Sequence, residues 1–336
     1  MSYRVVVIGA GGISRTHGEC LSALPEVALC GWADVRLERA QERAQQFGGV
    51  AFDDYTRMLT ELQPDVAHIC LPHFLHAPVA MACMKHGVHV LTEKPMSIHL
   101  QDAQAMVDTA KETEKTLGVI FQNRYNAGSQ MVKQALEAGK LGAVRSARAQ
   151  VCWFRDEDYY LSTDWRGRWE TEGGGVLINQ SIHTLDLIRW LVGTPVRVQA
   201  EYANFTHPRI EVEDMFTAYI DFANDARANM YLTTNHTAND PVEVHLYCDK
   251  GQVDMVGADA VIHYADGTEE QAKNQPVVAT SGPAYWGDSH MNQIQRFYHA
   301  LDAGETPEID GAEGLATQRL LCALYEAGRK RETVEV

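Results

Sequence analysis

Residues 5–14 read Val5-Val6-Val7-Ile8-Gly9-Ala10-Gly11-Gly12-Ile13-Ser14. The β-branched run at the start predicts a buried strand, and the glycines that follow it open a segment of helical character. Glycine at positions 9 and 11 lets the backbone turn tightly and approach a pyrophosphate, which the free N–H groups of a helix N-terminus attract. The stretch therefore predicts a dinucleotide-binding loop, with a plain strand–helix turn as the alternative. The expected cofactor contacts here are Gly9, Gly11, Gly12, Ile13 and Ser14, the last in the third position of the G-x-G-x-x-G pattern.

An acidic residue ends the next apolar run of the chain. This run, Val27–Ala33, leads directly to Asp34, at the spacing of about 20 residues from the glycine loop where a carboxylate accepts hydrogen bonds from the adenosine ribose. A carboxylate also repels the extra phosphate of NADP, although Arg36 nearby partly offsets the repulsion. The pattern therefore favours NAD over NADP, with Asp34 and Arg36 as cofactor contacts. The alternative role for Asp34 is an N-cap on the following helix.

Apolar runs alternate with amphipathic stretches from residue 4 to about residue 121. Such regular alternation of strand and helix predicts a doubly wound parallel sheet. The expected strands are residues 5–8, 27–33, 66–71, 88–91 and 117–121, and the expected helices are residues 37–47, 78–86 and 100–115.

The pattern changes after about residue 140 to longer β-type runs separated by short polar turns. Consecutive strands joined in this way predict an antiparallel sheet. An apolar helix at residues 176–192 interrupts the series, and helices at 290–303 and 313–331 close the chain. The expected strands are residues 144–154, 196–205, 216–222, 228–234 and 242–248.

Composition narrows the classes of partner. The chain has 336 residues, enough for two domains, and its 45% hydrophobic and 22% charged residues are typical of a soluble globular protein. A formal net charge of -16 disfavours nucleic acid and anionic membranes, because neutralising phosphates needs clustered Lys and Arg. The N-terminus lacks the features of a signal peptide, and no apolar run has the length of a membrane span. The seven cysteines form no Cys-x-x-Cys pair, so they predict neither a zinc site nor a disulfide framework. We expect a cytoplasmic protein that acts on a small molecule, with no metal site.

Two further motifs identify a family resemblance. Leu91-Thr92-Glu93-Lys94-Pro95 follows an expected strand, and Gly173-Gly174-Gly175 leads into the helix that carries His183 and Asp186. Together with the glycine loop, these motifs resemble the Gfo/Idh/MocA family of sugar and polyol oxidoreductases, over nearly the whole chain. The resemblance implies an α/β protein: a Rossmann doubly wound parallel sheet, expected over residues 1–122, and an α/β domain with a large, mostly antiparallel open sheet.

The second domain, expected over residues 123–336, would bind substrate and form a homodimer or homotetramer. Its C-terminal helices can pack back on the first domain.

Two residues stand out as candidates for proton transfer. Lys94 lies at the carboxyl end of a parallel strand, where open α/β sheets bind ligands, and Glu93 beside it is an expected cofactor contact. His183 lies on an apolar helix, where a buried imidazole must find partners or face a cavity. An exposed lysine and a satisfied core histidine are the ordinary alternatives. The resemblance implies that His183 is the general acid/base, that Lys94 is paired with it and contacts the cofactor, and that a cis peptide precedes Pro95.

Asn179 recurs on the same stripe as His183, one turn earlier. The polyol dehydrogenases of the family often have Asp at this position, whereas Asn cannot exchange a proton at neutral pH. We therefore expect Asn179 to hydrogen-bond a substrate hydroxyl. Asp186, on the same stripe, is expected to be structural.

Aromatic and arginine side chains supply further candidate substrate contacts. The dense stretch around Trp153, Tyr159 and Trp165 suits the apolar faces and hydroxyls of a sugar ring, with loop packing as the alternative. Arg124 could contact substrate or pair with a carboxylate. The expected substrate contacts are Asn179, Arg124, Tyr160, Trp165 and Arg166. Leu71, Pro72 and His76 are expected near the nicotinamide, with His76 as an alternative helix-start residue.

These features predict an NAD-dependent dehydrogenase or reductase that moves hydride between the cofactor and a secondary hydroxyl or keto carbon of a sugar, glycoside or polyol. The first alternative is a catalytically inactive NAD-binding sugar sensor or regulator, which would have damaged catalytic positions. The second is a redox-neutral enzyme in which transient oxidation serves elimination or epimerisation.

Overall fold

The computed structural model describes residues 2–274 and 289–336, and it divides into two compact units. Of the described residues, 2–122 and 289–316 form the first unit, and 123–274 and 317–336 form the second. The sequence predicts one domain over residues 1–122 and another over residues 123–336, whereas residues 289–316 group with the first unit. No helix in the described part of the chain has the length and apolar character needed to cross a membrane.

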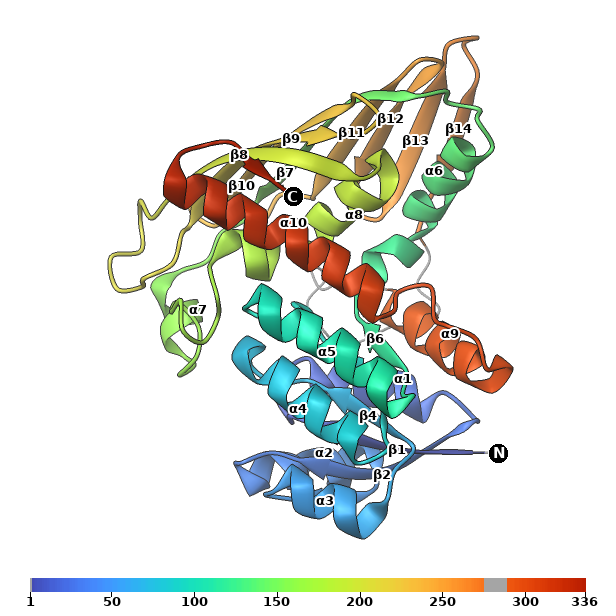
Figure 1. Ribbon diagram of the computed structural model, residues 1–336, viewed down its shortest axis with the longest axis vertical. Helices are drawn as coiled ribbons and strands as arrows, with labels where there is room; N and C mark the ends of the chain where they lie inside the picture. The colour runs from blue at the N-terminus through green and yellow to red at the C-terminus, as the bar shows by residue number, and fades with distance from the viewer. Residues whose placement is uncertain (1, 275–288) are drawn as a thin grey trace. The chain divides into compact units, whose positions relative to one another are not determined.

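The first unit is built on a six-stranded sheet with the order β3-β2-β1-β4-β5-β6 (Figure 1). Every neighbouring pair is parallel, which confirms the doubly wound Rossmann fold. The order reverses between β1 and β4, and ligands of such sheets bind at the carboxyl ends of the strands beside this switch point. The strands are β1 (Tyr3–Ile8), β2 (Val27–Ala33), β3 (Val50–Phe52), β4 (Val66–Ile69), β5 (His89–Thr92) and β6 (Leu117–Val119).

Helices join these strands and bury their apolar faces against the sheet. They are α1 (Ser14–Ser22), α2 (Leu37–Phe47), α3 (Tyr55–Leu62), α4 (His73–Lys85) and α5 (Leu100–Thr113). Helix α4 begins five residues before the predicted start because the helix continues through Pro78. Strand β3 and helix α3 were not predicted.

A helix from late in the chain completes the core of this unit. Helix α9 (His290–Ala303) contributes the buried side chains of Met291, Ile294, Phe297 and Tyr298 to the cluster that includes strand β1. Helix α10 (Gly311–Lys330) begins in the first unit and ends in the second.

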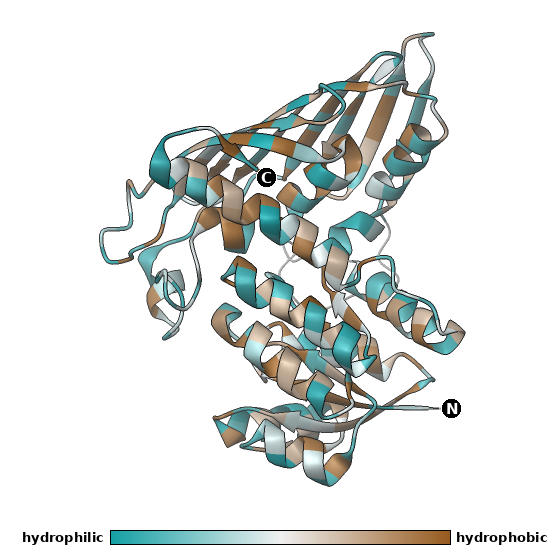
Figure 2. Ribbon diagram, in the orientation of Figure 1, coloured by the Kyte–Doolittle hydropathy of each residue, from teal (hydrophilic) through white to brown (hydrophobic). Residues whose placement is uncertain are grey.

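The second unit contains a nine-stranded sheet with the order β14-β13-β12-β11-β7-β10-β9-β8-β15. The β7/β10 pair is parallel and the other pairs are antiparallel, which confirms the large, mostly antiparallel sheet. Hydrophobic and hydrophilic residues alternate along its strands, as expected for strands with one buried face (Figure 2). The strands are β7 (Val144–Cys152), β8 (Pro195–Ala203), β9 (Met215–Phe222), β10 (Arg227–Thr233), β11 (Glu243–Cys248), β12 (Gly251–Val256), β13 (Asp259–Tyr264), β14 (Glu269–Ala272) and β15 (Val334–Glu335).

The predicted helix over residues 176–192 is divided. Val176–Gln180 form a π-helical turn, and helix α8 (Ile182–Val192) follows after Ser181. The sequence predicts that Asn179 lies one α-helical turn before His183. The wider π turn rotates Asn179 relative to His183, so that prediction is corrected. The remaining elements are a 3-10 turn (Gln122–Tyr125), α6 (Ala127–Glu137) and α7 (Glu157–Leu161).

Candidate functional site

The glycine loop after β1 has the backbone that a dinucleotide site needs. Gly9 has a φ of 95°, and a Cβ there would lie 2.3 Å from the carbonyl oxygen of Cys70, so packing alone requires glycine. A Cβ on Gly11 would meet nothing within 4 Å. Packing therefore does not explain glycine at position 11, whereas the approach of a pyrophosphate to the N-terminus of α1 does.

Asp34 connects the end of β2 to this loop. Its Oδ2 accepts a hydrogen bond from the Ala10 N–H at 2.9 Å, and its Oδ1 accepts one from the Arg36 N–H at 2.9 Å. Helix α2 begins at Leu37 without a side-chain cap, so the N-cap alternative for Asp34 is not observed. The half-buried carboxylate is held at the loop, as a contact to ribose hydroxyls would require.

Asp34→Ala is expected to weaken NAD binding by about 1 to 3 kcal/mol, the range for losing hydrogen bonds to a charged acceptor. NADP binding should weaken less, because the carboxylate that repels its extra phosphate is also lost. Fluorescence titration with both cofactors measures the difference, with Asp53→Ala, an exposed carboxylate of the same unit, as the matched control. Equal losses for the two cofactors would contradict the ribose assignment.

An arginine that the sequence analysis missed also contacts the loop. The guanidinium of Arg43 donates to the Ser14 hydroxyl at 3.2 Å and to the Gly11 carbonyl at 3.3 Å, and the Ser14 hydroxyl donates to the same carbonyl at 2.7 Å. Arg43 lies on α2, and the sequence does not distinguish it from an ordinary arginine on the solvent-exposed face of a helix. The contact depends on how α2 packs beside the loop, which sequence periodicity does not report.

His76 has a different environment from the one predicted. It is buried in α4, and its two ring nitrogens lie 2.7 Å from the Leu71 carbonyl and 2.6 Å from the Pro95 carbonyl. The imidazole therefore ties the loop after β4 to the turn after β5, in place of the expected cofactor contact. Leu71 and Pro72 are half-buried at the carboxyl end of β4, where a cofactor contact remains a prediction.

Lys94 lies in the turn after β5. The Lys94–Pro95 peptide is cis, as the family resemblance implies. The Lys94 side chain is half-buried, and its backbone N–H donates to Oε2 of Glu93 at 3.2 Å. The Glu93 carboxylate therefore holds the backbone of the candidate catalytic lysine.

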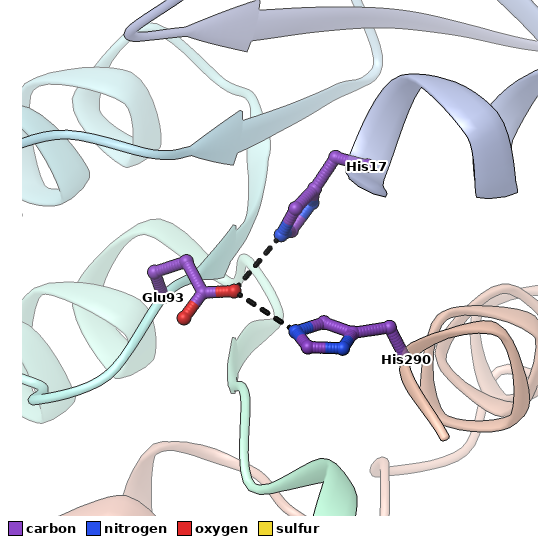
Figure 3. Close-up of side chains that lie close together, drawn as sticks. All are labelled: His17, Glu93 and His290. Carbon is purple, nitrogen blue, oxygen red and sulfur yellow. Dashed lines mark hydrogen bonds and ion pairs between the residues drawn. The ribbon is translucent and has the colours of Figure 1, made fainter. Parts of the chain in front are cut away.

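Glu93 is in turn held by a buried group of histidines (Figure 3). Its Oε1 lies 3.1 Å from Nε2 of His17, on α1, and 3.4 Å from Nε2 of His290, on α9. Nδ1 of His17 lies 2.7 Å from Nδ1 of His68, whose Nε2 lies 2.9 Å from the Tyr298 hydroxyl. We call these five residues the Glu93 network.

The chemistry of the network fixes where its protons lie. Burial raises the pKa of Glu93, but the hydrogen bonds from His17 and His290 outweigh it and hold that pKa well below its usual range. Burial lowers the pKa values of His17 and His68. An ionised carboxylate only accepts, so Nε2 of His17 carries a proton, its bare Nδ1 accepts from His68, and His68 accepts from Tyr298.

This network also has metal-ligand atoms, because one atom each of His17, Glu93 and His290 lie within 4.8 Å of one another. A metal would require bare ring nitrogens, whereas donation to Glu93 requires protonated ones. We therefore interpret the group as a hydrogen-bonded network that fixes Glu93. The absence of a metal site stays a prediction. Residues so distant in the chain have no metal-ligand spacing, so no sequence pattern predicts this convergence.

The second unit positions Asn179 and His183 on the segment after the glycine run. A Cβ on Gly175 would lie 2.0 Å from the Glu213 carbonyl, so this close approach requires glycine. The buried Glu213 carboxylate accepts from the Gly175 and Leu177 N–H groups at 2.9 and 3.1 Å. The start of the π turn is thereby fixed, and Asn179 and His183 follow it as half-buried side chains.

A second buried carboxylate, Glu172, lies beside Asn179. Its Oε1 accepts from Nδ2 of Asn179 at 2.5 Å, and its Oε2 accepts from the Gly167 N–H at 2.6 Å. Burial raises the pKa of Glu172 to about 7, and burial likewise raises that of Glu213 to about 7. Sequence reasoning missed both acids, although Glu172 directly precedes the glycine run.

Two of the expected substrate contacts are used within the second unit. Tyr160 is fully buried and its hydroxyl lies 3.0 Å from that of Thr234, so loop packing replaces the predicted substrate contact. Arg124 is buried and binds Asp186 through Nε and Nη2 at 2.7 and 2.6 Å. The ion-pair alternative for Arg124 is therefore the one observed, and Asp186 is structural.

Trp165 and Arg166 remain half-buried beside Tyr159. The Arg166 guanidinium lies 4.3 Å from the centre of the Tyr159 ring and 5.1 Å from that of Trp165. The Tyr159 hydroxyl accepts from the side-chain amide of Gln180 at 3.2 Å and lies 3.4 Å from that of Asn179. This aromatic and cationic group therefore adjoins Asn179, and its contact with substrate stays a prediction.

The buried acids and histidines predict opposite pH responses in the two units. Glu172 and Glu213 have raised pKa values, so the folded second unit binds their protons more tightly and loses stability as pH rises from 4.5 to about 7, by roughly 3 kcal/mol per group. His17 and His68 have lowered pKa values, so the first unit loses stability as pH falls below about 6.5.

Hydrogen-exchange protection factors measured at pH 5 and pH 7 should therefore fall on acidification in peptides around His17 and His68 and rise around Glu172 and Glu213. A parallel loss of protection in both units would contradict the assigned protonation states.

Comparison with known proteins agrees with these features. The family described as "Oxidoreductase family, NAD-binding Rossmann fold" matches residues 3–121, and the GFO/IDH/MocA C-terminal domain matches residues 129–254. The D-glucoside 3-dehydrogenase of Escherichia coli is 25% identical, with 99% of this chain and 97% of that protein covered. The myo-inositol 2-dehydrogenase of Thermotoga maritima is 24% identical, with 99% and 98% covered.

A solved structure is similar over its whole length. The WlbA dehydrogenase from Bordetella pertussis, in complex with NADH and UDP-GlcNAcA, superimposes with a TM-score of 0.88 at 28% identity, covering 100% of this chain and 99% of that one. This chain is therefore similar to dehydrogenases through both of its units.

Proposed function

Since the chain belongs to the Gfo/Idh/MocA family of NAD-binding oxidoreductases, we propose that it transfers hydride between NAD and a secondary hydroxyl or keto carbon of a sugar, glycoside or polyol. The observation that carries the proposal is the glycine loop, where Gly11 leaves open space at a helix N-terminus and Asp34 lies at the loop. Relatives that span the chain are named as dehydrogenases of a glucoside and of an inositol.

The residues of the loop fit the parts of NAD. Backbone N–H groups of Gly12 and Ile13 would face the pyrophosphate, and Asp34 would accept from the ribose hydroxyls. Bound NAD supplies the hydride acceptor, which no side chain of the protein can provide.

Proton transfer is assigned to His183 and Lys94. In the oxidative direction His183 removes the proton of the substrate hydroxyl as general base, and Lys94 orients the same oxygen or relays its proton. Asn179 hydrogen-bonds a substrate hydroxyl without exchanging a proton, because an amide does not titrate near neutral pH. In the reductive direction the same groups return the proton to the carbonyl oxygen.

The proposal also covers the compartment and the oligomeric state of the protein. We propose a cytoplasmic enzyme that forms a homodimer or homotetramer. Tyr219 and Tyr231 project from neighbouring strands of the nine-stranded sheet with 64% and 44% of their surface exposed. Large exposed aromatic residues on a sheet face are typical of association surfaces, and sedimentation of the purified protein tests this.

A substrate screen tests the function. Purified protein is mixed with NAD or NADP and with myo-inositol, D-xylose, methyl D-glucoside, levoglucosan, a sugar acid and a nucleotide sugar, and reduced cofactor is followed by absorbance. We expect NAD reduction with at least one compound. If product forms with no net NADH, the redox-neutral alternative replaces the dehydrogenase. Binding of NADH without turnover of any compound would favour the sensor.

A further inference from the structure

The side-chain amide of Asn179 is held in one orientation. Its Nδ2 lies 2.5 Å from Oε1 of Glu172, and a carboxylate oxygen that receives an N–H can only accept. The amide nitrogen must therefore face Glu172. The carbonyl oxygen of Asn179 is turned the opposite way, so the side chain presents an acceptor away from Glu172.

Glu172 is completely buried, and in its carboxylate form both of its oxygens only accept, which holds the Asn179 amide in this orientation. Its second oxygen accepts from the Gly167 N–H at 2.6 Å, so each carboxylate oxygen of Glu172 accepts from an N–H group. A glutamine in its place would offer one acceptor and one donor, and one of the two N–H groups would then face an N–H. The pair therefore requires one carboxylate and one amide: an amide at 179 is matched by a carboxylate at 172, and an amide at 172 would be matched by a carboxylate at 179.

We propose that Glu172 is a positioning residue that sets the hydrogen-bond polarity of Asn179, so that the side-chain oxygen of Asn179 accepts a hydrogen bond from a substrate hydroxyl. This inference deepens the proposed function and rests on it. It also accounts for the amide at a position where the polyol dehydrogenases of the family often have Asp, because Asp beside the buried carboxylate of Glu172 would place two like charges in contact.

Other charged and titratable groups surround the pair. Arg166 and Glu213 act on Glu172 through space, with opposite signs, and the Tyr159 hydroxyl lies 3.4 Å from the Asn179 amide. Burial raises the pKa of Glu172 to about 7. Assays at pH 8 therefore observe the carboxylate form that the two hydrogen bonds require.

A double-variant cycle tests the inference. The variants are Glu172→Gln, Asn179→Asp and the two together, and each is assayed at pH 8 with NAD and the compound of the substrate panel that the unaltered protein turns over fastest. Each single variant should raise KM by about tenfold and change kcat less than about threefold. In Glu172→Gln the oxygen of Asn179 no longer faces the substrate, and in Asn179→Asp the new carboxylate is repelled by that of Glu172. The double variant should return KM to within about threefold, because an amide at 172 then donates to a carboxylate at 179, which again presents an acceptor.

The controls separate this role from a structural one. Glu170→Gln makes the same chemical change at an exposed carboxylate of the same loop and should alter nothing. NADH affinity should be unchanged in every variant. Unchanged KM in the single variants, or losses that multiply in the double variant, would overturn the inference. If Glu172→Gln does not fold, the KM of Asn179→Asp is compared with that of the double variant, since only the double variant should recover the KM of the unaltered protein.

Failure of the proposed function is distinguishable from failure of the pair. If the unaltered protein turns over no panel compound, the proposed function fails and the substrate-facing part of the inference fails with it. The melting temperatures of the same variants then test the pairing of Glu172 with Asn179 without any substrate. Recovery in the double variant supports the pairing of Glu172 with Asn179, and additive losses overturn it.

Discussion

Replacing His183 by Ala should lower turnover by about 1000-fold, because the hydroxyl proton then has no positioned acceptor while hydride leaves the carbon. Asn179→Ala should act differently and appear mainly as a raised KM, since its amide contributes binding and not proton transfer. Steady-state kinetics on one verified substrate, with NAD saturating, measure both variants.

The pH dependence of kcat/KM adds a second readout. The acidic limb of oxidation should vanish in His183→Ala and survive in Asn179→Ala. Near-normal turnover of His183→Ala would remove this histidine from the mechanism and return it to the role of a packed helix residue.

Lys94→Ala should lower turnover by about 100-fold or more and leave NAD affinity nearly intact, because the lysine acts mainly on the reacting oxygen and its contact with the cofactor adds little to binding. Its backbone is held independently, through the hydrogen bond from the Lys94 N–H to Glu93, so the turn should persist after truncation of the side chain. Lys85→Ala, at the end of α4, is the matched control. Stopped-flow measurement of NADH formation separates the chemical step from cofactor release, and an unchanged hydride-transfer rate would exclude Lys94 from it.

The fold was predictable where its signals are local. Strand–helix alternation gave β2 and α2 with the observed bounds, because each is a single run with one period. Strand β3 was missed because its three residues follow Gly48 and Gly49 and have too little length for a periodic signal. Strand β14, with the sequence Glu-Glu-Gln-Ala, was missed because an edge strand of this polarity has no hydrophobic alternation.

The candidate site likewise contains some residues with a local sequence signal and others without one. The glycine loop and Asp34 were predictable because strand, loop and acid follow one another at fixed spacing. Glu172 carries no comparable signal, since its importance comes from burial against Gly167 and Asn179, and a lone glutamate in a polar loop usually lies in solvent. His17, Glu93 and His290 meet only because α9 joins the core of the first unit, and no spacing rule connects residues so distant in the chain.

The late entry of α9 into the core of the first unit has a consequence for folding during synthesis. A ribosome makes β1 to β6 first, but Phe297 and Tyr298 of the same core emerge only near the end of the chain. Until then the nascent first unit lacks part of its apolar interior, and Glu93 lacks its contact with His290. The unit that begins the chain is thus among the last to be completed, and its closure is a long-range event of the kind that slows folding and leaves apolar surface for chaperones.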